Sequence, residues 1–84
     1  MHVEFLGIPR ERAGISEVEF EAGTLGEALG ILASRFPALR ELITPDGLHP
    51  AVAANLNGDA FVNDPTTTLT ADDRLILLSA DAGG

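Results

Sequence analysis

The apolar run from Leu75 to Leu78 constrains the fold more than any other feature of this sequence. It lies in a segment, residues 74–80, whose side chains are mostly apolar. Such a run is typical of a strand that is buried on both faces at the centre of a sheet. With 84 residues, the chain can form one small domain but not two. We therefore expect a single sheet in which the last strand of the chain is the central one.

Two strands are predicted ahead of any helix. Residues 2–8 carry apolar side chains on both faces, which favours a central position in the sheet. Residues 9–14 are polar and end in Ala-Gly, so the sequence predicts a turn there. Residues 16–21 alternate between Glu and apolar residues, as a half-buried strand does. A hairpin between the two strands is the natural connection.

The strongest local signal is the start of a helix at Thr24. Thr24 and Glu27 match the capping box, in which the Thr24 hydroxyl accepts from the amide of Glu27 and the Glu27 carboxylate accepts from the amide of Thr24. Pro37 ends the helix near Phe36, and residues 38–43 are expected to add a short helical turn. The apolar residues behind the cap follow the spacing of one helix face: Leu25, Ala28, Leu29, Leu32, Ala33 and Phe36.

Turn residues divide the rest of the chain. Residues 44–47 predict a turn, and residues 51–56 a third strand. Asn57-Gly58 is the dipeptide most typical of a tight hairpin, with residues 59–62 as the return strand and Leu69 filling the core beyond it. The order β-β-α-β-β-β predicts an α+β fold, a β-grasp roll. In that roll one main helix covers one face of a mixed sheet of four or five strands.

Charge and composition exclude several classes of function. Thirteen acidic residues against five basic ones, all arginine, give a net charge of −8, and such a surface repels nucleic-acid phosphates. It suits a basic partner surface, or solubility alone. The absence of cysteine excludes disulfides, thiol nucleophiles and a β-grasp iron–sulfur ferredoxin. No run approaches the roughly 20 apolar residues of a membrane span. No signal-peptide pattern is found, so we expect a cytoplasmic protein without a membrane partner.

Few side chains suggest a site of their own. His2 and His49 are far apart in the sequence and lack neighbours typical of metal ligands, so no metal site is predicted. Asp72-Asp73 is interpreted as a turn-forming pair rather than as an acid–base pair. Phe61, on the short return strand, is either core or an exposed partner anchor, and the face of the last strand that lacks the helix can add Ile76 and Leu78 to a docking patch. The core is expected to hold the other aromatic residues, Phe5, Phe20 and Phe36.

These features together resemble a known family. The β-grasp order, the acidic surface, the Asn57-Gly58 hairpin, the Ala-Asp-Asp-Arg-Leu75 segment after Leu69 and the final Ala82-Gly83-Gly84 are similar to the ubiquitin-like sulfur carriers. These include the small subunit of molybdopterin synthase, the thiamine-pathway carrier and relatives in cysteine or thio-modification pathways. The length and residues 9–12 are most similar to the molybdopterin-synthase subunit. Asp81 departs from the small or apolar residue expected there.

The resemblance implies a carrier with no catalytic residues of its own and no bound cofactor. An E1-like adenylating enzyme would use ATP to activate the Gly84 carboxylate, and a sulfurtransferase or cysteine desulfurase would supply sulfur for a thiocarboxylate. A sulfur-accepting synthase, such as the large subunit of molybdopterin synthase, would receive it. Residues 1–80 would form the domain and residues 81–84 a flexible tail, since Gly can enter a narrow channel. Partners would contact Gly83, Ala82, Asp81 and Phe61.

Other functions remain open at this point. The same tail could join the chain to target lysines, as in a ubiquitin-like modifier, or serve a thiamine or cysteine pathway. The chain could also be a plain interaction module with an incidental Gly-Gly end. A free-standing enzyme ranks last, because no nucleophile, base and orienting group occur together.

Overall fold

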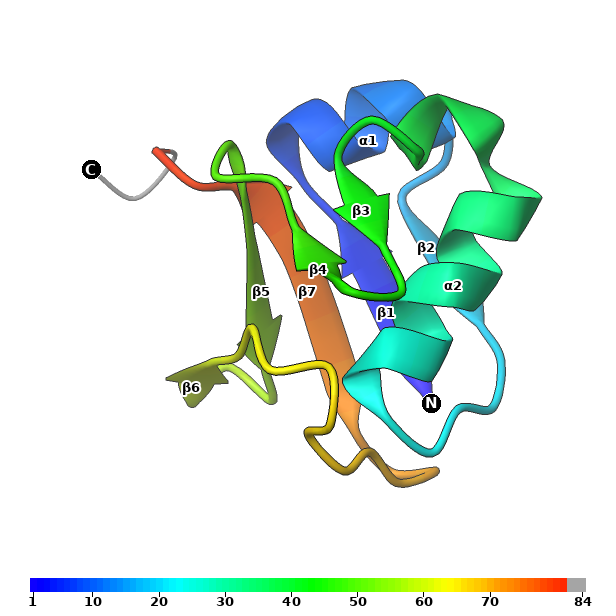
Figure 1. The fold of residues 1–84 in the computed structure, drawn as a ribbon, viewed down its shortest axis with the longest axis vertical. Coiled ribbons are helices and arrows are strands. Elements are labelled where there is room, and N and C mark those ends of the chain that lie inside the picture. Colours follow the sequence, from blue (N-terminus) through cyan, green and yellow to red (C-terminus); the bar gives the residue numbers. More distant parts are fainter. Residues whose placement is uncertain (82–84) are drawn as a thin grey trace.

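A computed structural model describes residues 1–81, and within them a mixed five-stranded sheet has the order β2-β1-β7-β5-β6 (Figure 1). β7 pairs parallel with β1 and antiparallel with β5. The last strand therefore lies at the centre of the sheet, and the predicted β-grasp class is confirmed. The strands are β1 (His2–Phe5), β2 (Glu17–Glu19), β5 (Val52–Leu56), β6 (Ala60–Phe61) and β7 (Arg74–Ser79).

One face of the sheet holds the core and the other stays open. In β7, Leu75, Leu77 and Ser79 are buried, whereas Ile76 and Leu78 are only half-buried. The prediction that this strand is buried on both faces is therefore wrong. The reason is that α2 (Leu25–Arg35) packs on one face only (Figure 1), and the side chains that alternate to the other face lack such a cover.

The start of α2 is close to the predicted capping box. The Thr24 hydroxyl accepts from the Glu27 amide at 3.2 Å. The Glu27 carboxylate, however, accepts from the amide of Gly23, at 3.2 Å, and not from that of Thr24. Thr24 is held extended and bridged to Thr68, and in that geometry the carboxylate reaches one residue further back. The helix face behind the cap is buried as predicted from Leu25 to Ala33, whereas Phe36, the residue after the helix, is only partly buried.

A second helix, α1 (Gly7–Ala13), replaces the predicted end of the first strand and the turn after it. Gly7 has φ 60° and ends the extended segment. Pro9 lies in the first helical turn, where its missing amide hydrogen is not needed. Gly14, at φ 78°, closes the helix in the left-handed region, and its amide donates to the Arg10 carbonyl at 2.9 Å. Pro9 near the start of α1 and Gly14 after its end are residues typical of helix termini.

The remaining elements are short. The 3-10 helix η1 (Pro37–Leu39) supplies the predicted helical turn, and β3 (Ile43–Thr44) pairs with β4 (Gly47–Leu48) in a hairpin around the predicted turn. Asn57 and Gly58 both have positive φ, as a tight β5–β6 hairpin requires. No helix within residues 1–81 has the length and apolar character needed to cross a membrane. The buried core includes Phe5, Leu25, Leu29, Leu32, Leu39, Ile43, Leu69, Leu75 and Leu77.

Three of the four phenylalanines lie in the core or pack against it, and the fourth is exposed. Phe5 is fully buried, and its ring meets that of Phe36 edge to face, with 5.6 Å between the centroids. Phe20 and Phe36 are partly buried and pack against the core. Phe61 is 70% exposed. The core prediction is therefore confirmed for Phe5, whereas Phe20 and Phe36 only pack against the core. Of the two alternatives for Phe61, the exposed one is correct.

Candidate functional site

The open face of the sheet carries one continuous row of side chains from all five strands. The register pairs Glu17 with Glu4, Glu4 with Ile76, Ile76 with Asn55, and Asn55 with Phe61. Because paired residues point to the same face, the row runs from acidic at β2 to apolar at β6. The open face thus has two halves of different chemistry.

The apolar half contains the residues expected in a docking patch. Ile76 and Leu78 are half-buried and share this face with Ala53, the partner of Leu78 in the register. Phe61 projects from the edge strand β6. Asn55 lies between Ile76 and Phe61, and its Oδ1 is shielded from solvent without a hydrogen-bond partner among residues 1–81.

A groove of about 450 Å³ adjoins this half. Its lining includes Phe61 and Val62 together with the loop residues His49 and Pro50. Ala80 also lines it, directly after the end of β7. The groove therefore joins the exposed aromatic side chain to the segment that leads toward the C-terminus.

The end of β7 is held firmly as far as Ala80. The Ala80 amide donates to the Ala51 carbonyl at 2.8 Å. One residue earlier, the buried Ser79 hydroxyl accepts from the Ile8 amide of α1 at 2.8 Å. Asp81 follows in an exposed turn. The predicted site residues Ala82, Gly83 and Gly84 lie outside the described residues.

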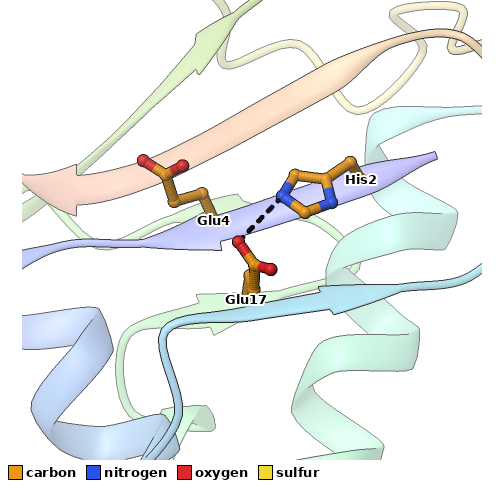
Figure 2. Close-up of side chains that lie close together, drawn as sticks. All are labelled: His2, Glu4 and Glu17. Atoms are coloured by element: carbon orange, nitrogen blue, oxygen red, sulfur yellow. Dashed lines mark ion pairs between the residues drawn. The ribbon is translucent and has the colours of Figure 1, made fainter.

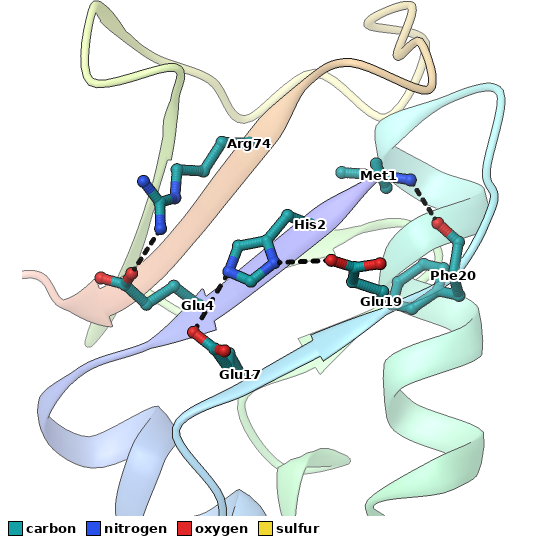
Figure 3. A network of polar contacts seen from close by, with 7 residues as sticks. All are labelled: Met1, His2, Glu4, Glu17, Glu19, Phe20 and Arg74. Atoms are coloured by element: carbon teal, nitrogen blue, oxygen red, sulfur yellow. Dashed lines mark hydrogen bonds and ion pairs between the residues drawn. The ribbon is translucent and has the colours of Figure 1, made fainter.

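The acidic half is organised around His2 (Figures 2 and 3). Its Nε2 lies 3.3 Å from Glu17 Oε2 and its Nδ1 lies 3.4 Å from Glu19 Oε1. Beside it, Arg74 Nη2 lies 3.2 Å from Glu4 Oε1. The expectation that His2 has no ligand-like neighbours is therefore wrong, because strand pairing brings residues 17 and 19 against residues 2 and 4.

The other titratable candidates have structural roles. His49 Nδ1 accepts from the Ala51 amide at 2.9 Å within its loop. The Asp73 carboxylate accepts from Asn57 Nδ2 at 2.9 Å and from the Thr70 amide at 2.7 Å. These hydrogen bonds, that of Asn57 first, lower the pKa of Asp73 below its ordinary value. Asp73 therefore links the β5–β6 hairpin to the turn before β7. This agrees with the prediction that Asp72-Asp73 forms a turn.

Comparison with known proteins places this fold in a class. No family model and no curated protein matches the sequence. Among solved structures, the chain is similar to the BexX/CysO complex of Amycolatopsis orientalis (TM-score 0.78, 26% identity, 99% of this chain and 98% of the other). It is also similar to SAMP1, a small archaeal modifier protein of Haloferax volcanii (TM-score 0.73, 27% identity, 100% of this chain and 98% of the other). A putative molybdopterin converting factor subunit 1 from Pyrococcus furiosus shares the fold (TM-score 0.73, 19% identity, 93% and 93%).

These neighbours define the class as ubiquitin-like β-grasp proteins. They are ubiquitin-like sulfur carriers, and the resemblance found in the sequence is confirmed. They are small carrier or modifier proteins, and this chain shares their fold over nearly its whole length.

Proposed function

We propose that this chain is a sulfur carrier whose Gly84 carboxylate is adenylated and converted to a thiocarboxylate, for molybdopterin synthesis or a related pathway. One observation carries the proposal. β7, the central strand of a sulfur-carrier fold, brings the chain to Ala80 beside a groove and the exposed Phe61. From Ala80, four further residues can reach at most about 14 Å, enough to enter a partner's cleft.

The chemistry runs on the tail, inside the partner enzymes. A C-terminal carboxylate is ionised at neutral pH, and its oxygen attacks the α-phosphate of ATP, so that pyrophosphate leaves and an acyl-adenylate forms. The terminal sulfur of an enzyme persulfide then attacks the Gly84 carbonyl carbon and expels AMP. A thiol reduces the resulting acyl disulfide, which releases the thiocarboxylate and leaves the persulfide donor in a disulfide with that thiol.

The open face supplies the docking surface in this proposal. Its apolar half offers Ile76, Leu78 and Phe61 for burial against a partner, as interface centres require. The net charge of −8 favours encounter with a basic partner surface. The E1-like enzyme and the sulfur-accepting synthase would use this face in turn, each while holding the tail.

The test is a reconstitution followed by intact mass. The purified native chain is first weighed to establish that it ends at Gly84. It is then incubated with ATP, its cognate adenylating enzyme and a sulfurtransferase. We expect a mass gain equal to the replacement of one oxygen by sulfur, and no gain for a chain shortened by Gly83 and Gly84. The proposal would be overturned if the mass stayed unchanged although the adenylating enzyme used was shown to be active.

A protein modifier is the second candidate. The 27% identity to SAMP1 of Haloferax volcanii over the whole chain favours it. In that case covalent adducts on target lysines would be recovered from cells and would disappear when Gly84 is deleted. The thiocarboxylate can also serve a thiamine or cysteine pathway, and supplying each acceptor synthase in turn to the charged carrier distinguishes the pathways.

A further inference from the structure

Three potential metal ligands meet at the acidic half of the open face, from His2, Glu4 and Glu17 (Figure 2). One ligand atom from each lies within 4.8 Å of the other two. His2 and Glu4 are two residues apart on β1 and so share a face, and Glu17 of β2 pairs with Glu4 in the register. Backbone pairing in a sheet, rather than a loop, sets the positions of the three residues.

The imidazole of His2 has an unused nitrogen directed at this cluster. Nε2 is shielded from solvent and makes no hydrogen bond with residues 1–81, although Glu17 Oε2 is 3.3 Å away. A shielded polar atom without a hydrogen bond is unfavourable. Neutral imidazole nitrogen is the commonest metal ligand among side chains, so a bound cation would give Nε2 a partner.

The surroundings of the cluster resemble the outer shell of a metal site (Figure 3). Glu19 Oε1 lies 3.4 Å from His2 Nδ1. If Nδ1 donates its proton to this carboxylate, the Nε2 lone pair is free for a metal. Arg74 contacts Glu4 through Oε1 at 3.2 Å, and the carboxylate has a second oxygen for a metal.

We propose that His2 Nε2, Glu4 and Glu17 bind a divalent transition-metal ion such as Zn²⁺, with Glu19 as a positioning residue. One imidazole and two carboxylates suit Zn²⁺ and its neighbours, whereas Ca²⁺ and Mg²⁺ prefer oxygen ligands alone. Three protein ligands leave one tetrahedral position open. The three ligands lie on the same open face as the apolar half, so a partner docked on that face could supply a fourth ligand. The metal site does not depend on the sulfur chemistry of the tail.

The experiment measures Zn²⁺ binding to the full chain without any tag, since a histidine tag would itself bind zinc. The chain is stripped with a chelator and titrated with Zn²⁺ against a chromogenic competitor. We expect one ion per chain. His2→Gln and Glu17→Gln should each weaken binding by at least about tenfold, because even outer-shell changes cost about 10–100-fold in affinity. Glu19→Gln should fall within that 10–100-fold range.

Two variants serve as matched controls. Glu41→Gln removes an exposed carboxylate that pairs with Arg12 elsewhere on the surface, and His49→Gln removes the other imidazole. Both should bind Zn²⁺ as the unchanged chain does. In addition, Zn²⁺ should raise the midpoint of thermal unfolding of the unchanged chain, since it binds the folded state, and leave that of His2→Gln where it was.

The ring resonances of the two histidines give an independent readout. Zn²⁺ should shift those of His2 and leave those of His49 unchanged. Equal zinc affinity of His2→Gln and the unchanged chain would overturn the proposal, and so would a shift confined to His49. A folded, unchanged chain that binds no Zn²⁺ would overturn it as well. Circular dichroism of each variant establishes that it is folded.

Discussion

Gly7 is the residue at which the chain changes most abruptly from strand to helix. It has φ 60°, and a Cβ placed there would collide with the Ser79 hydroxyl. That hydroxyl already accepts from the Ile8 amide at 2.8 Å. The contact ties α1 to the end of β7, the strand that leads to the proposed reactive end. Two constraints therefore act on one position, a left-handed backbone and a lack of space.

We predict that Gly7→Ala destabilises the fold more than Gly14→Ala does. Gly14 has a similar φ of 78° but open space around its Cβ position, so its replacement costs only the left-handed strain of about 1–2 kcal/mol. At Gly7 the overlap adds about 1–3 kcal/mol. Urea unfolding followed by circular dichroism measures both, since the chain has no Trp or Tyr. Equal losses would show that Ser79 yields without cost.

Asp73 gives a pH-dependent contribution at the same scale. Its hydrogen bonds with Asn57 and with Thr70 lower its folded-state pKa below the ordinary 3.8. A lowered pKa stabilises the folded state above pH 3.8, and this contribution is lost as the pH falls from there through the folded-state pKa. We predict that Asp73→Asn reduces the pH dependence of the unfolding free energy in that acid range, to which Asp64, whose pKa is also lowered by hydrogen bonds from Thr66, still contributes. Asp72→Asn removes a neighbouring carboxylate that makes no hydrogen bond with the described residues, and it controls for the loss of one negative charge.

At the scale of elements, short sequence patterns were sufficient to predict α2 and the β5–β6 hairpin. The helical spacing behind Thr24 and the dipeptide Asn57-Gly58 each specify one conformation within a few residues. α1 was missed because its seven residues, Gly7–Ala13, are too few to show a helical period, although Pro9 and Gly14 mark its ends. The β3–β4 hairpin has two residues on each strand, and such strands carry no alternation to detect.

The two halves of the open face also differ in how far local sequence predicts them. For Ile76, Leu78 and Phe61 the sequence left both burial and exposure open, because each lies on a strand with apolar residues whose cover depends on where the helix packs. The His2 cluster could not be predicted, because it depends on the register between β1 and β2. A shift of one residue would turn Glu17 to the other face. Register is set by packing over the whole sheet and not by any short stretch of sequence.

The cap of α2 is the element-scale feature that is simplest to test. The Thr24 hydroxyl satisfies the Glu27 amide at 3.2 Å. Thr24→Ala should therefore lower the unfolding free energy by about 1 kcal/mol, as is usual for loss of a cap. Thr24→Ser keeps the hydroxyl and should lose less than half of that. If both substitutions cost the same, the bridge to Thr68, rather than the cap, would account for the loss.

At the scale of the whole molecule, one face of the sheet packs the core and the other is open. The covered face holds the core with α2, while the open face displays an apolar half beside an acidic half that contains Glu4 and Glu17. Substitutions on the open face can thus change partner binding without removing core contacts. This separation allows a docking role to be tested apart from stability.

Phe61→Ala tests that docking role directly. Its side chain is 70% exposed, so its removal should change the unfolding free energy by no more than about 0.5 kcal/mol. If it anchors the adenylating enzyme, the KM for this carrier should rise by at least about tenfold, the loss of a central aromatic contact. The kcat should stay unchanged, because the Phe61 side chain takes no part in the chemistry proposed at the carboxylate. Ile15→Ala removes another large apolar side chain, 42% exposed, in the loop after α1, and should leave KM unchanged. Equal KM values for the two variants would place the docking surface elsewhere.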